Sequence, residues 1–385
     1  MTQSLMMVAG ERSGDIYGAR LAAALRERLP EIDLFGCGGE LMRAAGVETV
    51  VDSHQFAMVG ITEVISGLPR AYRSFHALLD DAERRRPELA VLIDSPSLNI
   101  RLAKQLKNRG IKVVYFISPQ IWAWKRWRLG QLKKRIHRML CIFDFEEAIY
   151  RQAGIPVQYV GHPLVDAVHP SLTREAFFAQ AGLDLDVPTI ALLPGSRQIE
   201  IDFNLPRMLE AAAQISSRRR TQFVIAQAPT LDPERIKSHL LEGSAAQLSV
   251  QLVNATYDTL RHSDLAVVAS GTATLEAALL ECPMLVVYRV SSVTAFFARF
   301  MVNVPFYSMV NLLAARPVVK ELIQSDFTPL RVATQIEYLL DHPAARDEMR
   351  GELRELRAHL GSGGAIERAA EAVTSMMGSA VRVGI

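Results

Sequence analysis

The sequence predicts an α/β protein with two Rossmann-like domains facing a cleft. Short runs of β-branched and apolar residues alternate with segments of helical periodicity, which is typical of βαβ units and of mostly parallel sheets. This alternation begins again in the second half of the chain. The length of 385 residues exceeds what one hydrophobic core usually supports, so two domains are expected.

The first series of predicted strands defines an N-terminal domain over residues 1–165. Helical periodicity between the strands is clearest at 16–28 and 99–109. The predicted strands are residues 5–9, 34–37, 49–51, 89–93, 112–117, 139–143 and 157–160.

The second series defines a C-terminal domain over residues 186–360. A polar, proline-containing stretch at 162–188 precedes it and is the predicted linker. The end of the chain, 347–377, is predicted to be helical with a glycine-rich break at 361–364. The last helix, about 364–378, is expected to pack back on the first domain. The predicted strands are residues 189–193, 222–226, 249–252, 265–269 and 284–288.

Composition excludes several classes of protein. Hydrophobic residues at 49% and charged residues at 22% are ordinary for a globular chain and exclude extensive disorder. The formal net charge of +2 argues against a nucleic-acid-binding protein. The widely spaced Cys37, Cys141 and Cys282 are expected to be small core residues in a reducing cytoplasm. The N-terminus does not resemble a signal peptide, and no apolar window reaches ~18 residues, so neither secretion nor a membrane span is expected.

A loop typical of anion binding follows the predicted strand 189–193. It contains Gly195, Ser196 and Arg197 in the run Leu-Leu-Pro-Gly-Ser-Arg. The guanidinium of an arginine presents a bidentate fork that suits a diphosphate. The alternative is a solvated loop arginine with no ligand.

A second such loop follows the predicted strand 265–269. Ser270, Gly271, Thr272 and Ala273 come directly before an alanine- and leucine-rich helix. The amides of Ser270, Gly271 and Thr272, and those of the helix start behind them, are expected to face phosphate oxygens. Glu276 lies one turn further, within expected reach of a ribose diol. Each motif alone is more often structural than functional. Together they predict a nucleotide-diphosphate site.

Further motifs extend the pattern along the chain. They are residues 10–15 (Gly-Glu-Arg-Ser-Gly-Asp), 58–64 (Met-Val-Gly-Ile-Thr-Glu-Val), 118–124 (Ser-Pro-Gln-Ile-Trp-Ala-Trp), 160–163 (Val-Gly-His-Pro) and 311–314 (Asn-Leu-Leu-Ala). In order and spacing, these motifs and the two loops resemble the lipid-A-disaccharide synthase family over essentially the whole chain. One position departs from the pattern, because Ser97 stands where the family often carries a second acidic residue.

The resemblance implies a GT-B type inverting glycosyltransferase. Members of the family join a UDP-linked 2,3-diacylglucosamine donor to a 2,3-diacylglucosamine 1-phosphate acceptor, which gives a β-1,6 disaccharide and UDP. The resemblance implies no cofactor and no metal, and the sequence contains no evident cluster of His, Asp or Cys at metal-ligand spacing. It also implies that Asn311 faces the sugar or the diphosphate, although this residue could simply cap a helix.

Inversion by direct displacement needs a general base beside the acceptor hydroxyl. Asp94 follows the predicted strand 89–93 and is therefore expected at the carboxyl edge of the sheet, where open α/β folds bind ligands. Its alternative role is to cap a turn. Glu11 in the first βα loop is the rival base, although neighbouring Ser13 and Asp15 could be there only to cap the following helix. The lone His162 is expected to be a hinge or turn residue.

Acylated substrates imply contact with an anionic membrane surface, on the inner face of the inner membrane. Aromatic residues beside basic ones suit such an interface. A core helix or a dimer-contact helix, the latter in a homodimer, is the alternative for each candidate. The candidates are Met58, Val59, Ile61 and Val64, then Trp122, Trp124 and Trp127, and a third stretch at 295–301.

Two other functions remain open from the sequence. A hydrolysing UDP-N-acetylglucosamine 2-epimerase would keep the UDP site without needing an apolar acceptor surface. A nucleotide-sensing binding protein would keep the site without turnover. Release of UDP only in the presence of both acylated sugars would separate the three.

Overall fold

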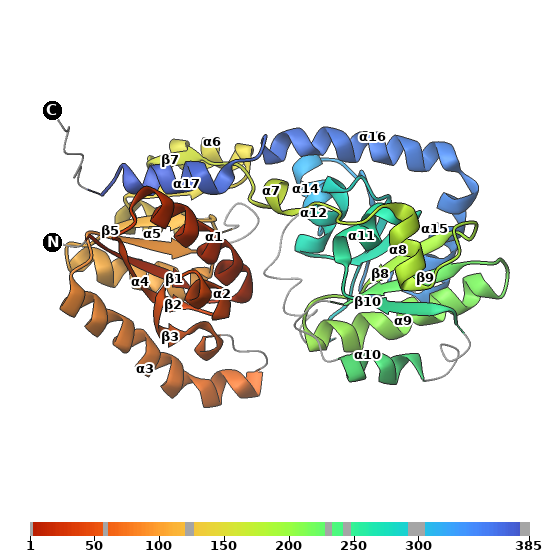
Figure 1. The fold of residues 1–385 in the computed structure, drawn as a ribbon, viewed down its shortest axis with the longest axis horizontal. Coiled ribbons are helices and arrows are strands. Elements are labelled where there is room, and N and C mark those ends of the chain that lie inside the picture. The colour runs from red at the N-terminus through yellow and green to blue at the C-terminus, as the bar shows by residue number, and fades with distance from the viewer. Residues whose placement is uncertain are drawn as a thin grey trace. The chain divides into compact units, whose positions relative to one another are not determined.

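The chain folds into two compact α/β units (Figure 1). The computed structural model describes residues 3–56, 61–119, 127–227, 233–241, 248–291 and 305–377, with only the backbone described for 61–68. The first unit comprises Met1–Pro163 and Leu360–Ile385, and the second comprises Leu164–His359. Each unit is built around one sheet, and every strand pair in both sheets is parallel. The predicted fold class is confirmed.

The first sheet has the strand order β3-β2-β1-β4-β5-β6-β7. All seven strands coincide with predicted ones, because runs of buried apolar residues give a strong signal in parallel sheets. Ala9 at the end of β1 pairs with Ile93 at the end of β4. The strands are β1 (Ser4–Ala9), β2 (Asp33–Gly38), β3 (Glu48–Asp52), β4 (Leu89–Ile93), β5 (Lys112–Phe116), β6 (Arg138–Cys141) and β7 (Val157–Tyr159).

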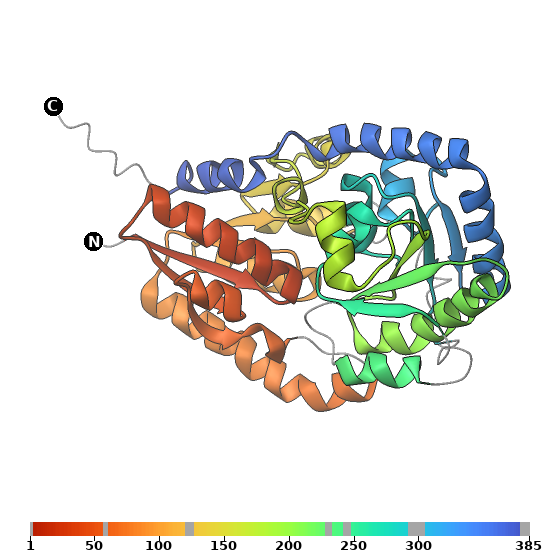
Figure 2. The same ribbon diagram turned by 45° about the vertical axis from the view of Figure 1, so that its right-hand side comes forward.

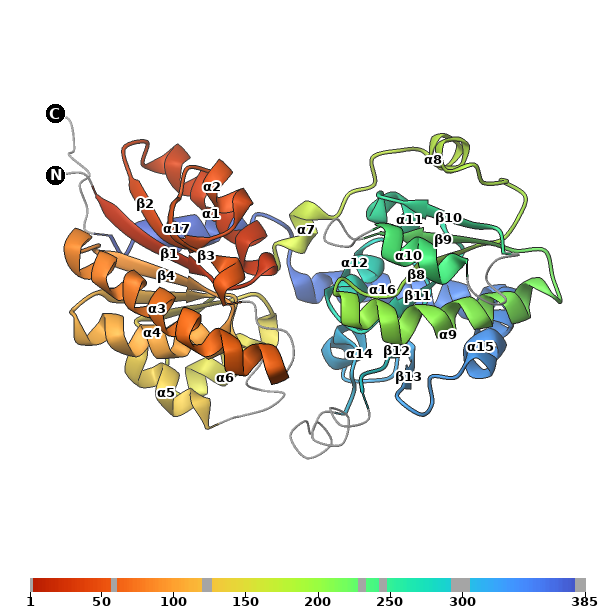
Figure 3. The same cartoon turned by 90° about the horizontal axis from the view of Figure 1, so that it is seen from below.

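Helices cover both faces of this sheet. Figure 3 shows α3, α4 and α5 on the side opposite α1 and α2. Met6 and Val8 of β1 point to a core that includes Leu78 of α3 and Leu102 of α4. The late helix α17 packs against α1 within this unit. The helices are α1 (Arg12–Arg28), α2 (Glu40–Ala44), the short 3-10 helix η1 (Ser53–Gln55), α3 (Ile61–Arg85), α4 (Pro96–Asn108), α5 (Arg128–Arg135), α6 (Asp144–Gln152) and α17 (Ala365–Thr374).

The second sheet has the strand order β10-β9-β8-β11-β12-β13. Its edge strand β13 was not predicted, because Lys320 and Glu321 open it and interrupt the apolar run. Charged residues are common on edge strands, where they discourage pairing with other chains. The strands are β8 (Thr189–Leu193), β9 (Gln222–Ala226), β10 (Val250–Val253), β11 (Leu265–Ala269), β12 (Met284–Tyr288) and β13 (Lys320–Ile323).

The helices of the second unit also lie on both faces of its sheet. The α9 and α15 helices pack together, and α10 lies beside α9 (Figure 2). The α12 helix packs against β11 and α14. The stretch 162–188, predicted as a linker, contains helices α7 and α8. The helices are α7 (Leu164–Ala167), α8 (Arg174–Ala181), α9 (Gln198–Ser216), α10 (Pro233–Leu240), α11 (Thr256–His262), α12 (Thr272–Leu279), α14 (Met309–Ala314), α15 (Pro329–Asp341) and α16 (Pro343–Leu360).

Two properties bear on the predicted protein class. Cys37, Cys141 and Cys282 are free and buried, as predicted for core residues. In the part of the chain that the structure describes, no helix has both the length and the apolar character to cross a membrane.

Candidate active site

Each sheet has a point where the chain reverses its direction of strand addition. In the first sheet this switch point lies between β1 and β4, and in the second it lies between β8 and β11. Loops that follow the two central strands diverge there, and open α/β folds bind ligands in the resulting crevice at the carboxyl edge. Glu11 follows β1 and Asp94 follows β4, whereas Arg197 follows β8 and Ser270 follows β11. The predicted site segments therefore lie in pairs, one pair at each switch point.

Asp94 occupies an unusual backbone conformation at the end of β4. Its φ is +51° and that of Ser95 is +42°, so two successive non-glycine residues lie in the left-handed region. Ser13 Oγ donates a hydrogen bond of 3.4 Å to Asp94 Oδ2. Burial, and secondarily the negative charge of Glu11, raise the pKa of Asp94 to about 6. A carboxylate with this pKa is suited to act as a general base near neutral pH.

Ser13 and Asp15, the neighbours of Glu11, do not cap α1 as the alternative had it. Glu11 is exposed and is the N-cap residue of α1, and its side chain makes no capping bond. The buried Asp15 carboxylate caps α2 instead, because it accepts hydrogen bonds from the amides of Gly39, Leu41 and Met42 at 2.6, 3.2 and 3.1 Å. Asp15 is therefore structural. Ser13 contacts Asp94, a role that no sequence signal indicated.

The loop after β8 binds a carboxylate of the same chain, that of Glu200. Glu200 Oε2 accepts hydrogen bonds from the amides of Ser196 at 2.9 Å and Arg197 at 3.3 Å. Gly195 has a φ of +131°, and a Cβ there would overlap the Glu200 carboxylate. The Arg197 side chain is 60% exposed, with Nη1 lying 3.8 Å from Glu200 Oε1. Glu200 occupies the position of the glutamate in a capping box, but the sequence did not indicate it, because Arg197 stands where such a box begins with Ser or Thr.

A buried asparagine fixes the same loop to the sheet. Asn204 Nδ2 donates to the carbonyl of Pro194 at 2.9 Å, and Asn204 Oδ1 accepts from the amide of Arg289 at 3.1 Å. Because Arg289 directly follows β12, this side chain connects the ends of two strands. Asn204 was not predicted, since an asparagine within a helical pattern gives no sign of its partners.

The loop after β11 leaves the start of α12 open. Gly271 is the N-cap residue and contributes no side chain, and both Gly271 and Thr272 are exposed. The prediction that the Ser270 amide faces phosphate is wrong, because that amide donates to Val287 O at 2.9 Å in the sheet. The Ser270 hydroxyl is also used, in a 2.8 Å bond to Tyr307 O. The amides of Gly271, Thr272 and Ala273 come before the first hydrogen bond of the helix, from Thr274 N to Gly271 O at 3.1 Å. Amides at this position of a helix commonly bind anions.

Glu276 lies one turn into α12 and is partly buried. Burial raises the pKa of its carboxyl to about 7, and a hydrogen bond from Tyr257 opposes that shift. Contact with a ribose diol stays a prediction.

Asn311 is directed into its own domain. It is 1% exposed, and Nδ2 donates to Val319 O and to Glu321 Oε1, both at 2.8 Å. Asn311 Oδ1 accepts from Val319 N at 2.9 Å. The suggestion that Asn311 caps a helix is wrong, since Ser308 caps α14 by accepting from the Asn311 amide. The prediction that Asn311 faces a sugar stays a prediction. Both hydrogens of its side-chain amide are already used in hydrogen bonds within the domain.

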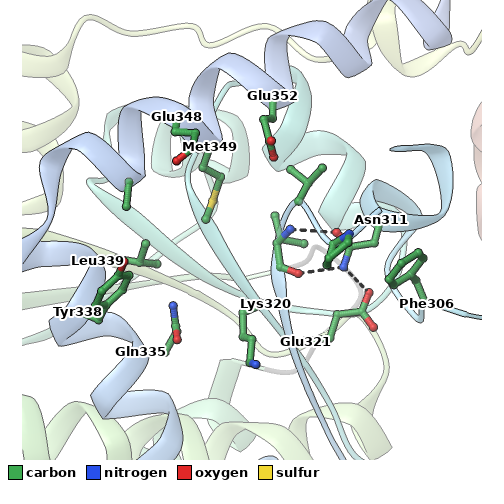
Figure 4. A pocket seen from close by; sticks show the side chains of 14 residues that line it. Phe306, Asn311, Lys320, Glu321, Gln335, Tyr338, Leu339, Glu348, Met349 and Glu352 are labelled. Atoms are coloured by element: carbon green, nitrogen blue, oxygen red, sulfur yellow. Dashed lines mark hydrogen bonds between the residues drawn. The ribbon is translucent and has the colours of Figure 1, made fainter. Parts of the chain in front are cut away.

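Glu321 connects this network to the open start of α12. Its carboxylate also accepts from the amides of Tyr307 and Ser308, both at 2.9 Å. Since Ser270 binds Tyr307 O, the segment before α14 is held beside the loop after β11. Figure 4 places Asn311 and Glu321 on one wall of a cavity of about 480 Å³. This cavity is lined by the amino end of β13, so it is separate from the carboxyl edge at the switch point.

His162 is buried, and its expected role as a hinge or turn residue stays a prediction. Burial lowers its pKa to about 3, so the ring is uncharged near neutral pH. Its ring centroid lies 5.3 Å from that of Phe143, and its amide donates to Leu360 O at 2.8 Å.

Comparison with known proteins identifies the family. A family profile described as lipid-A-disaccharide synthetase matches residues 5–373. A lipid-A-disaccharide synthase of Myxococcus xanthus is 46% identical over 374 residues, which is 97% of each chain. The chain belongs to the lipid-A-disaccharide synthase family. It is accordingly a glycosyltransferase, and the epimerase alternative is not favoured.

Solved structures of other proteins share the fold of this chain. The Staphylococcus aureus MnaA–UDP structure has a TM-score of 0.66 at 12% identity and covers 97% of this chain and 96% of that one. The calicheamicin glycosyltransferase CalG4 has a TM-score of 0.60 at 17% identity and covers 98% and 99%. At these identities the likeness shows the fold alone.

The predicted membrane residues of this lipid-A-disaccharide synthase family member are described only in part. Trp127 is 64% exposed, with the Arg128 guanidinium carbon 5.6 Å from its ring centroid. Lys133 and Lys134 of α5 are exposed nearby in sequence. Ile61 and Val64 lie in α3 where only the backbone is described. Outside the described residues lie Met58, Val59, Trp122, Trp124 and residues 295–301.

Within the described ranges, no group of three or more His, Cys, Asp or Glu side chains is arranged to hold a metal ion.

Proposed function

We propose that this chain joins a UDP-linked 2,3-diacylglucosamine donor to a 2,3-diacylglucosamine 1-phosphate acceptor. The products are the β-1,6-linked disaccharide 1-phosphate and UDP. One observation carries the proposal: Asp94, with its pKa raised to about 6, lies at the switch point of the first sheet. The open helix start at the switch point of the second sheet is the corresponding feature of the second unit.

Asp94 is the proposed general base. It removes the proton of the acceptor 6-hydroxyl while that oxygen attacks the anomeric carbon of the donor. The bond between the anomeric carbon and the diphosphate oxygen breaks, and its electron pair leaves with UDP. A single displacement of this kind inverts the anomeric carbon. Glu11 contributes the negative charge that helps keep the pKa of Asp94 high, and it remains the rival base.

The second unit is proposed to bind the donor. The first amides of α12, at Gly271, Thr272 and Ala273, would stabilise the charge that develops on the diphosphate. Arg197 would add a bidentate cation. Glu276 would bind the ribose. The UDP present in the MnaA structure supports a UDP site in this fold.

The chain is further proposed to act at the inner face of the inner membrane as a peripheral protein. The acyl chains of both substrates require a lipid surface. Trp127 supports this proposal, because an exposed indole beside cationic side chains suits an interface with anionic headgroups.

Release of UDP tests the proposed reaction. Purified protein is incubated with the acylated donor, the acylated acceptor or both, and UDP is measured. The proposal expects UDP only when both are present. Release from the donor alone would indicate a hydrolysing epimerase, and no release would indicate a binding protein.

Calorimetry tests the donor site separately. Arg197→Ala and Glu276→Ala should each weaken UDP binding by roughly 1.5–3 kcal/mol, the usual loss for a hydrogen bond to a charged group. Unchanged UDP affinity in both variants would place the nucleotide elsewhere.

A further inference from the structure

The turn between β4 and α4, here called the Asp94 elbow (residues 93–95), holds a conformation that its sequence does not favour. Asp94 and Ser95 both have positive φ, which non-glycine residues rarely adopt, and here two such residues are consecutive. A backbone of this kind persists only where the surrounding structure enforces it.

Two buried side chains enforce the elbow through one carbonyl. Tyr115 of β5 donates its hydroxyl proton to Asp94 O at 2.5 Å. Asn99 of α4 donates through Nδ2 to the same oxygen at 2.9 Å and to Ile93 O at 3.0 Å. Both side chains are 0% exposed. In addition, the Asp94 amide donates to Phe116 O at 3.0 Å, so both polar backbone groups of Asp94 are fixed.

We infer that Asn99 and Tyr115 are positioning residues for Asp94. With the Asp94 carbonyl drawn into the domain by two donors, rotation of the adjoining peptide would break both bonds. The Cα–Cβ bond is therefore held toward the other side, where the carboxylate lies beside Ser13 Oγ. Neither residue touches a reacting atom, and each acts only through the direction of Asp94. The inference rests on the proposed role of Asp94 as the base.

General burial of polar groups does not explain the arrangement. A buried tyrosine hydroxyl or asparagine amide needs some hydrogen-bond partner, and most core carbonyls would serve. Here side chains from a strand and a helix meet on the carbonyl of the one strained residue that carries the proposed base. A displacement of a reacting group by about 1 Å can cost roughly a hundredfold in rate. Precise direction of this carboxylate therefore matters for turnover.

The first test compares two tyrosines of the same unit. Tyr115→Phe removes the hydroxyl and leaves the ring in the core. Tyr150→Phe is the matched control, because Tyr150 is also fully buried and its hydroxyl donates to a backbone carbonyl, that of Pro119, at 3.2 Å. We expect Tyr115→Phe to lower kcat by about tenfold or more with an unchanged KM for the donor. Tyr150→Phe should leave both unchanged. Thermal unfolding of each variant verifies that the folded protein is compared.

A double-mutant cycle separates positioning from general structural damage. In an Asp94→Asn background, Tyr115→Phe and Asn99→Ala should cause no further loss of kcat, because the base they direct is already absent. An undiminished further loss would overturn the inference, as would a normal kcat for folded Tyr115→Phe. If Asn99→Ala does not fold, the Tyr115→Phe arm decides alone. Normal turnover by Asp94→Asn itself would instead refute the proposed base, which is a distinguishable result.

Discussion

The carboxylate of Glu200 lies 2.9 Å from the backbone nitrogen of Ser196, four residues earlier in the chain. This contact distinguishes the two helix starts at the second switch point. The start of α9 already holds a negative charge from its own chain, whereas the start of α12 has only Gly271 as its N-cap residue. A phosphate would be repelled by the first and attracted by the second. We therefore propose that the diphosphate binds at the start of α12, and that Arg197, the N-cap residue of α9, contributes only its cationic side chain.

Glu200→Gln is expected to weaken the fold and UDP binding together. The neutral amide keeps the size of the side chain but no longer attracts the two loop amides or Arg197 as strongly. The free energy of unfolding should fall by ~1 kcal/mol, as for loss of a helix cap, and UDP affinity should fall several-fold. Denaturant unfolding and calorimetry measure the two effects.

Thr328→Ala is the control for Glu200→Gln. Thr328 caps α15 in the same unit by accepting a hydrogen bond from Arg331 N at 3.3 Å. Its loss should lower stability similarly and leave UDP affinity unchanged. Tighter UDP binding by Glu200→Gln would contradict the assignment, since it would mean that phosphate competes with Glu200 for the same amides.

Gly271→Ala should weaken UDP binding without destabilising the protein. The Gly271 φ of 160° is extended backbone that alanine adopts readily, and a Cβ there would meet no atom within 4 Å. The added methyl group would occupy the space through which phosphate approaches the helix start. We expect an unchanged unfolding temperature and a loss of about tenfold in UDP affinity by calorimetry, where tenfold corresponds to ~1.4 kcal/mol.

Gly351→Ala provides the matched substitution. Gly351 lies within α16, and its added Cβ would also meet no atom within 4 Å. Alanine is a better helix former, so this variant should be about 1 kcal/mol more stable with unchanged UDP affinity. Equal UDP affinity in both glycine variants would exclude the α12 start from the donor site.

The sequence predicted where the candidate loops lie, because each follows a buried apolar strand. Such strands can be identified locally, and the carboxyl ends of parallel strands share one edge. The partners of these loops were harder to predict. Tyr115 is 21 residues from Asp94 and is an apolar-looking member of β5, and only the pairing of β4 with β5 brings its hydroxyl to the Asp94 carbonyl. The Ser270 amide was misassigned because its partner, Val287, belongs to a strand formed later in the chain.

The decrease of activity at low pH, the acid limb of the pH profile, should follow the protonation of Asp94. The active base is the deprotonated carboxylate, and the pKa raised to about 6 means that kcat/KM falls as the pH drops through about 6. Above that pH the base is ionised, so activity is retained. Above about pH 6, Asp94→Asn should lower turnover by about 100-fold or more, and its residual activity should lack the decrease near pH 6. Initial rates over a pH series at subsaturating acceptor measure both.

Glu11→Gln should move that limb to lower pH. The Glu11 charge raises the pKa of Asp94, so its removal makes the base ionise more easily. Glu40→Gln, which changes an exposed carboxylate in the first turn of α2, should leave the limb in place. Loss of turnover at all pH values in Glu11→Gln, together with an active Asp94→Asn, would identify Glu11 as the base.

Trp127→Ser is expected to reduce binding to anionic vesicles. An exposed indole inserts into the headgroup region, and burial of one large apolar side chain contributes about 1.5–3 kcal/mol. Arg128, Lys133 and Lys134 should add an electrostatic share that salt weakens, because charges are screened over about 10 Å at 0.1 M. Sedimentation with phosphatidylcholine vesicles, with and without phosphatidylglycerol, measures the apolar and the electrostatic contributions to binding. Leu330→Ser is the control, since Leu330 is 59% exposed on α15 of the second unit. Equal sedimentation of both variants and the unchanged protein would mean that Trp127 does not contact lipid and that the acyl chains enter by another surface.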